Sequence, residues 1–134
     1  MSSLLSYLPQ HEGLLPKWLF FVSVVSVLNS SQAYLSATYT SQLYNSAPAN
    51  ALQSRTFGTW TFLSAVLRAY AAYYIDEPHV YDLAMWTYAI AWTHFVSEWL
   101  IFGSAKLKGR FLGPFIVASG SLLWMAGQRG WYLG

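Results

Sequence analysis

The segment that decides the fold is Tyr81–Phe102, YDLAMWTYAIAWTHFVSEWLIF, in which His94 and Glu98 lie within an apolar, aromatic-rich run. The helix of a soluble protein places an ionised carboxylate on a polar face. The residues around Glu98 leave no such face. A run of this length also suits the roughly 20 apolar residues that a helix needs to cross a bilayer. The segment therefore predicts a membrane helix that carries two ionisable side chains.

The composition of the whole chain indicates the same solvent. Of its 134 residues, 55% are hydrophobic and 9% are charged, whereas soluble domains have about 25% charged residues. This length gives one domain. The net charge of +2 is scattered, which excludes a nucleic-acid partner. Cysteine is absent, so disulfides, thiolate metal sites and cysteine nucleophiles are excluded together.

Four apolar segments follow one another along the chain. We expect an all-α fold, an integral membrane four-helix bundle, with helices at about residues 16–43, 55–75, 79–102 and 112–129. The first helix is drawn long because small residues recur at steps of three and four, as on one helix face. These residues are Ser23, Ser26, Ser30, Ala33, Ala37 and Thr40. The short loops predict antiparallel neighbours.

Small residues mark the faces on which helices in lipid approach closely. The second helix carries such a stripe, and so does the third: Gly58, Thr61, Ala65, Arg68 and Ala72, and Ala84, Thr87, Ala91, His94, Glu98 and Ala105. The fourth has Gly113, Gly120 and Gly127, a candidate dimer face. An aromatic stripe accompanies the third helix: Tyr81, Met85, Tyr88, Trp92, Phe95, Trp99 and Phe102. This stripe predicts either packing and lipid contact or a docking face for a membrane partner or a sterol-like ligand.

Ionisable residues inside the membrane need a partner or a route to the headgroups. In an antiparallel hairpin of the second and third helices, Arg68 and Glu98 lie over about 10 Å apart along the axis, at about 1.5 Å per residue. The depth count instead pairs Glu98 with Arg55. We expect Arg68 to form a separate polar site that reaches towards Asp82 or the headgroups.

His94 and Glu98 lie four residues apart on one helix face, a spacing that suits a metal or an acid–base pair. The chain has three histidines, too few for a membrane di-iron site, and no nucleotide loop or nucleophile elbow. We therefore expect no catalytic residue, no cofactor and no metal, with His94 and Glu98 as structural polar groups. The enzymatic alternative is proton transfer on a lipid, in a pocket around Trp92, His94 and Glu98.

Three segments carry a family resemblance: LLPKWLFFVSVVSVLNS (14–30), SRTFGTWTFLSAVLRAYAAYYI (54–75) and YAIAWTHFVSEWLIFGS (88–104). In these and in overall length the chain resembles the ergosterol biosynthetic protein 28 family. The most specific blocks are Arg55–Trp60, followed by Arg68, and His94–Glu98. The resemblance implies a small endoplasmic-reticulum membrane protein without catalytic activity. It also implies that Arg55, Trp60, Arg68, His94 and Glu98 matter, without giving them catalytic roles.

The resemblance further implies three protein partners: the sterol C-4 methyl oxidase, the decarboxylating sterol-4-carboxylate 3-dehydrogenase and the 3-keto sterol reductase. Our leading hypothesis is a multi-pass scaffold in the endoplasmic-reticulum membrane that tethers these enzymes in ergosterol biosynthesis. The alternative is a protein that binds membrane lipid or sterol, or a sterol isomerase-like enzyme that uses His94 and Glu98. A homodimer is compatible with the scaffold.

Overall fold

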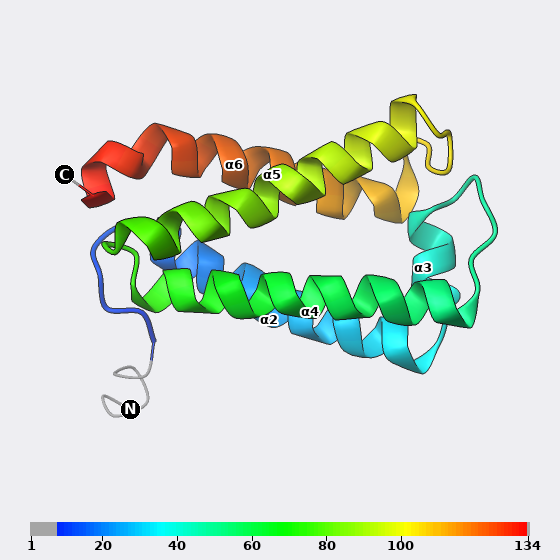
Figure 1. Cartoon of the computed structure of the whole chain (residues 1–134), viewed down its shortest axis with the longest axis horizontal. Helices are drawn as coiled ribbons and strands as arrows, with labels where there is room; N and C mark the ends of the chain where they lie inside the picture. The colour runs from blue at the N-terminus through cyan, green and yellow to red at the C-terminus, as the bar shows by residue number, and fades with distance from the viewer. Residues whose placement is uncertain (1–7, 134) are drawn as a thin grey trace.

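The computed structural model describes residues 8–133, and within them the secondary structure is entirely helical (Figure 1). The helices are α2 (Leu15–Leu35), α3 (Thr38–Leu43), α4 (Ala51–Tyr73), α5 (Pro78–Leu100), a 3-10 turn η1 (Gly109–Phe111) and α6 (Leu112–Leu133). The all-α prediction is confirmed. Two segments of the described chain, Leu15–Leu35 and Gly109–Leu133, are long and apolar enough to cross a membrane.

The four long helices lie side by side in a layered arrangement. Helices α2 and α4 form one layer, α5 and α6 form the other, and α4 and α5 are antiparallel neighbours joined by a short turn (Figure 1). At one end, α3 and η1 lie together. At the other end, Arg129 of α6 makes a two-point ion pair with Asp82 of α5, at 2.8 and 2.9 Å.

The prediction of one long first helix was wrong, because the helix breaks between α2 and α3. Ser36 has an extended backbone, with φ −162° and ψ 147°. Its hydroxyl accepts from the Thr38 backbone N–H, and the Ser54 hydroxyl of α4 binds the carbonyl oxygen of Ala33 at 2.6 Å. Serine and threonine side chains compete in this way with the backbone pairing of a helix. The small-residue stripe marks the buried face but not helix continuity.

The predicted boundaries of the other helices differ less from those in the structure. Helix α4 begins four residues before the predicted position, because the Asn50 side chain accepts a hydrogen bond from the Gln53 backbone N–H and caps the helix. Glu77 caps α5 by accepting from the backbone N–H groups of His79 and Val80. Helix α6 runs to Leu133 rather than residue 129.

The two ends of the interior are filled separately. One cluster lies where α2 begins and α6 ends and includes Leu15, Leu19, Tyr81, Tyr88 and Met125. The second lies beneath α3 and η1 and includes Leu43, Phe57, Phe95, Phe111 and Ala118. Between the clusters the helices leave a cavity, which is described below.

The predicted small-residue faces of α4 and α5 do form helix contacts. Gly58 is buried, and a Cβ built on it would lie 3.0 Å from the backbone oxygen of Ser30 and 2.9 Å from the Tyr34 ring. Helices α2 and α4 are therefore as close as their backbones allow at this point. On α5, Ala84, Thr87 and Ala91 are buried. By contrast, a Cβ on Gly113, Gly120 or Gly127 of α6 would meet open space.

A single asparagine fastens the two loops at the α3 end. The Asn45 side chain donates to the carbonyl oxygens of Lys106 and Lys108 and accepts from the Lys106 backbone N–H. The Ser46 backbone N–H donates to the Ser104 carbonyl. The loop after α3 is thus joined to the basic loop that precedes α6.

Candidate functional site

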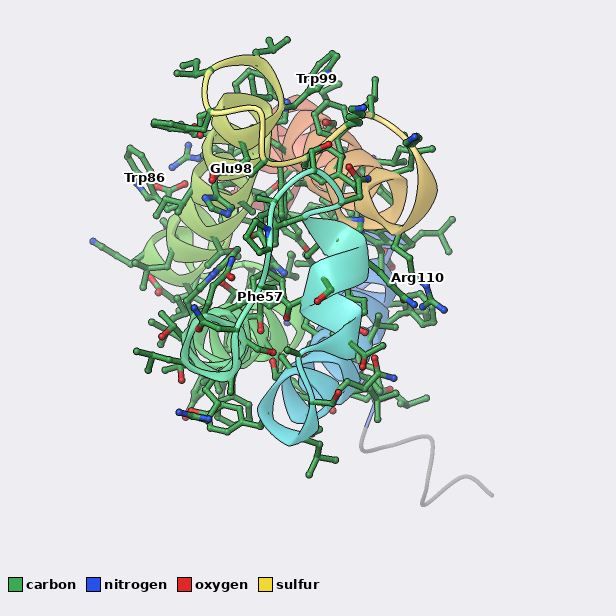
Figure 2. All side chains as sticks on the ribbon, turned by 90° about the vertical axis from the view of Figure 1, so that its right-hand side faces the viewer. Phe57, Trp86, Glu98, Trp99 and Arg110 are labelled. Carbon is green, nitrogen blue, oxygen red and sulfur yellow. The ribbon has the colours of Figure 1, made fainter. Side chains whose placement is uncertain are left out.

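The predicted site residues do not form one site. His94 and Trp60 lie together in an aromatic cluster, Trp60 and Arg68 both line one cavity, and Arg55 and Trp92 are exposed. Glu98 is half-buried near the end of α5, seen end-on in Figure 2. Position along the helix axis is therefore a poor guide to which of these side chains meet.

His94 is held in the aromatic cluster by a hydrogen bond from outside its own helix. Its Nε2 lies 2.6 Å from the hydroxyl of Tyr44, which follows α3. The rings of Tyr44, Trp60 and Phe95 surround the imidazole, with centroids 5.7, 5.7 and 5.3 Å away. Burial raises the pKa of Tyr44, and the negative charge of Glu98 adds to the shift. Tyr44 therefore keeps its proton at neutral pH. Sequence reasoning missed Tyr44 at this site, because it lies outside α5, directly after α3.

The predicted Arg55–Glu98 pair does not form. Within residues 8–133 the ion pairs are His11–Asp76, His79–Glu77 and Arg129–Asp82. The depth count took the rise of the helix into account but not its rotation. Arg55 precedes Arg68 by 13 residues, and at 3.6 residues per turn this places it about 220° around α4. Since Arg68 faces the interior, Arg55 faces outwards and is exposed.

Arg68 is a separate polar site, as predicted, but it does not reach Asp82 or the molecular surface. Its side chain is buried, with 7% of the residue exposed. Its Nε donates to the Thr87 hydroxyl at 3.0 Å, and the guanidinium carbon lies 4.0 Å from the centre of the Tyr88 ring. Asp82 is taken by Arg129 instead. The contact with Thr87 and Tyr88 fits the predicted antiparallel packing of α4 and α5.

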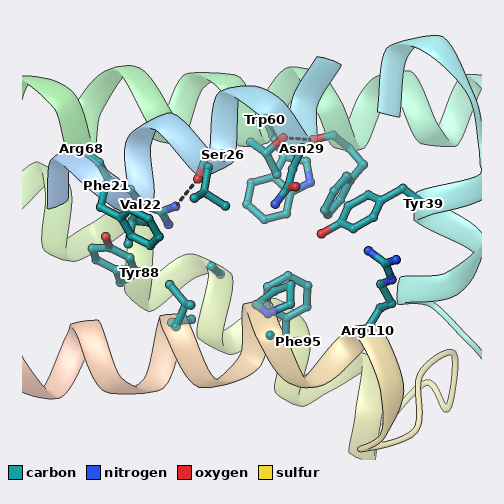
Figure 3. A pocket seen from close by; sticks show the side chains of 18 of the residues that line it. Phe21, Val22, Ser26, Asn29, Tyr39, Trp60, Arg68, Tyr88, Phe95 and Arg110 are labelled. Atoms are coloured by element: carbon teal, nitrogen blue, oxygen red, sulfur yellow. Dashed lines mark hydrogen bonds between the residues drawn. The ribbon is translucent and has the colours of Figure 1, made fainter. Parts of the chain in front are cut away.

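A cavity of about 470 Å³ lies between the two layers of helices and includes Arg68 in its wall (Figure 3). Its wall is drawn from α2, α3, α4, α5, η1 and α6: Trp18, Phe21, Val22, Val25, Ser26, Asn29, Tyr39, Phe57, Trp60, Thr61, Arg68, Tyr88, Ala91, Phe95, Gly109, Arg110, Gly113, Pro114, Val117 and Ala118. Trp92, His94 and Glu98 are not among these residues. This cavity is therefore not the pocket that the enzymatic alternative places around those three residues.

Arg110 of η1 lies at the far end of the cavity from Arg68, and its guanidinium points towards Tyr39 of α3 (Figure 3). Burial raises the pKa of Tyr39, and the charge of Arg110 opposes that shift. The two arginines therefore place a positive charge at each end of a largely apolar cavity. Sequence reasoning missed Tyr39 and Arg110, which come from segments expected to be helix interior and loop.

The aromatic stripe of α5 is mainly a packing surface. Tyr81, Tyr88 and Phe95 are buried, and Met85 and Trp99 are half-buried against the core clusters. Trp92 and Phe102 of the same stripe are exposed. Leu83, Trp86 and Ile90 are further exposed apolar residues of α5, with Trp86 64% exposed. Figure 2 shows Trp86 at the edge of the molecule.

Within residues 8–133 no three His, Asp or Glu side chains lie close enough together to hold a metal ion.

Comparison with known proteins identifies the family. The family described as Erg28 like protein matches residues 15–123. The chain belongs to the Erg28 family. It is 48% identical to ergosterol biosynthetic protein 28 of Saccharomyces cerevisiae, over 92% of this chain and 85% of that protein. The corresponding Erg28 protein of Candida albicans is 46% identical over 90% of this chain and 89% of its own length.

The similarity extends to animals. The homologue of ergosterol biosynthetic protein 28 in Homo sapiens is 38% identical, over 84% of this chain and 83% of that protein. No solved structure matches the chain. The Erg28 match covers α2, α4, α5 and most of α6, so the aromatic cluster and the cavity both lie within it.

Proposed function

We propose that this protein is a non-catalytic scaffold of the endoplasmic-reticulum membrane that tethers the enzymes of sterol C-4 demethylation in ergosterol biosynthesis. The observation that carries the proposal is the 48% identity, over 92% of the chain, to a protein named ergosterol biosynthetic protein 28. The proposed partners are the sterol C-4 methyl oxidase, the decarboxylating sterol-4-carboxylate 3-dehydrogenase and the 3-keto sterol reductase.

The proposal includes four membrane crossings. Helices α2 and α6 have the length and apolarity of a span. Helices α4 and α5 have 23 residues each, which at about 1.5 Å per residue gives about 34 Å, enough for a hydrocarbon core of about 30 Å. Since both pack beside α2 and α6, crossing with them would keep the two layers together in the bilayer.

The surface of the protein supports association within the membrane. Large apolar side chains are exposed on every long helix, for example Leu28 of α2, Leu63 of α4, Trp86 of α5 and Leu123 of α6. These faces can contact lipid or another membrane protein. A scaffold acts by holding successive enzymes close together, which raises the effective concentration at which one enzyme's product meets the next enzyme.

The test is co-purification of the tagged full-length chain in mild detergent, with each of the three enzymes detected by its own antibody. We expect all three to be recovered. Recovery of none of them, from membranes in which all three are present, would overturn the proposal. Replacing Trp86 and Ile90 of α5 by alanine tests whether the exposed face of α5 is needed for recovery of the enzymes. Replacing Leu123 of α6, which is also exposed, is the matched control.

A further inference from the structure

Arg68 has a charge that the described protein does not neutralise. None of the ion pairs within residues 8–133 includes it. A guanidinium has five N–H donors. The hydrogen bonds of Arg68 use two of them, to Thr87 at 3.0 Å and to Ser26 at 3.5 Å. The second distance is at the limit for a hydrogen bond. A charged residue inside a membrane is costly unless it is paired. Arg68 is therefore suited to an anionic partner from outside the chain.

The cavity beside Arg68 offers further polar groups but no negative charge. Its wall contains two arginines, and none of the described residues that line it is acidic. The Tyr88 hydroxyl is buried without a hydrogen-bond partner among the described residues, although its ring covers the guanidinium. A positively charged space with an unsatisfied hydroxyl favours a ligand that brings hydrogen-bond acceptors and negative charge.

The same cavity has access from the membrane side. Helices α2 and α6 touch through Trp18, whose Nε1 donates to the Ser121 hydroxyl at 2.8 Å and whose ring packs on Trp124. Beyond this contact the two helices diverge and their residues line the cavity (Figure 3). Phe21 and Val25 of α2 are exposed beside it. Since α2 and α6 are the two segments suited to a span, the gap between them faces hydrocarbon.

Size and wall chemistry complete the description of the ligand. A cavity of about 470 Å³ lies within the range of about 300–1,000 Å³ that is typical of small-molecule sites. Its wall is mainly aromatic and aliphatic, with Ser26, Asn29 and Thr61 as neutral polar groups. These features fit an amphiphile with one apolar body and one small acidic head.

We propose that the cavity binds a lipid monocarboxylate, whose carboxylate is held by Arg68 and whose apolar body lies between α2, α5 and α6. The planar guanidinium matches a carboxylate with two parallel hydrogen bonds. The Tyr88 hydroxyl is a further donor on the same side. This site is additional to the proposed scaffold role, and a chain that tethered no enzyme would still bind the ligand.

The test uses the purified full-length chain in phosphatidylcholine nanodiscs. A steroid carboxylic acid and oleate are each titrated beside the corresponding neutral alcohol, and binding is followed by tryptophan fluorescence, since Trp18 and Trp60 line the cavity. We expect at least one acid to bind tenfold or more tightly than its alcohol. Arg68→Met should abolish this preference. Arg55→Met, an exposed arginine on the same helix, should keep it.

The two acids distinguish the source of the carboxylate: preference for the steroid acid indicates a sterol ligand, and preference for oleate a fatty acid. Equal binding of acid and alcohol, or a preference that survives Arg68→Met, would overturn the proposal. If Arg68→Met fails to fold, Gly113→Phe serves instead, since Gly113 lines the cavity and its added Cβ meets no atom within 4 Å. Undiminished acid binding by Gly113→Phe would contradict the site.

Discussion

Helix α2 forms one interface with α4, the tight seam, and another with α6, the loose seam. The two differ in how closely the helices pack. Against α4, the helix meets backbone at Gly58, and serine hydroxyls cross the seam from Ser23 to the Ala65 carbonyl and between Ser30 and Thr61. Against α6, one tryptophan hydrogen bond closes the end of the seam and a cavity occupies the rest. Small residues thus produce a tight pair, whereas large aromatic residues on α2 leave space.

The largest effect is expected where the tight seam has no room. Gly58→Val should lower the free energy of unfolding by about 2–3 kcal/mol, because the new side chain is forced against the Ser30 backbone and overpacks the seam. Reversible unfolding in mixed detergent micelles measures the change. Gly120→Val on α6 is the control, because a Cβ there meets no atom within 4 Å. Equal losses in both variants would assign the effect to the β-branched side chain rather than to the close approach.

A smaller loss is expected from the hydroxyl that holds α2 at its break. The Ser54 Oγ lies 2.6 Å from the Ala33 carbonyl oxygen and 2.9 Å from the Thr40 hydroxyl. Ser54→Ala should cost about 1–2 kcal/mol, since buried groups lose a partner. The same unfolding assay applies. Ser119→Ala, whose hydroxyl bonds only within α6, should change stability by less than about 0.5 kcal/mol, and a similar loss there would remove the distinction between the seams.

The loose seam should respond in geometry more than in stability. Trp18→Phe removes the donor to Ser121 and should cost about 0.5–1.5 kcal/mol while widening the gap between α2 and α6. The chain has no cysteine, so cysteines introduced at the exposed positions Leu28 and Ile116 are the only sites that a spin label can modify. The distance between the two labels reports the separation of α2 and α6. We expect a broader distance distribution in Trp18→Phe and none of this broadening in Trp131→Phe.

Acid should not weaken either interface of α2 directly. We expect the loss of stability in acid to arise at Glu77, in the turn between α4 and α5. The hydrogen bond from the Val80 backbone N–H, followed by those from His79, lowers the pKa of Glu77. Because the folded pKa lies below the unfolded one, the carboxylate stabilises the fold above the unfolded pKa and this is lost as pH falls through the folded pKa. Melting temperature should therefore fall in acid, and Glu77→Gln should show a smaller fall. An unchanged acid profile in that variant would place the sensitivity elsewhere.

The sequence predicted the helix faces better than the side-chain partners. The small-residue stripes of α4 and α5 lie in helix contacts because close approach in a packed interior needs small side chains, which is a local property. The Arg55–Glu98 pair failed because a pairing between helices depends on rotation as well as depth. The Tyr44–His94 contact could not be predicted, since it requires the break at Ser36 that turns α3 back over the interior.

That break also sets the thickness of membrane that the protein fits. Helix α2 has 21 residues, which gives about 32 Å at about 1.5 Å per residue and matches a hydrocarbon core of about 30 Å. An unbroken helix over the 28 positions from 16 to 43 would be about 42 Å long and would have to tilt or thicken the bilayer. In the proposed membrane-spanning arrangement, ending the helix at Leu35 avoids this mismatch, which would be greatest in a thin membrane.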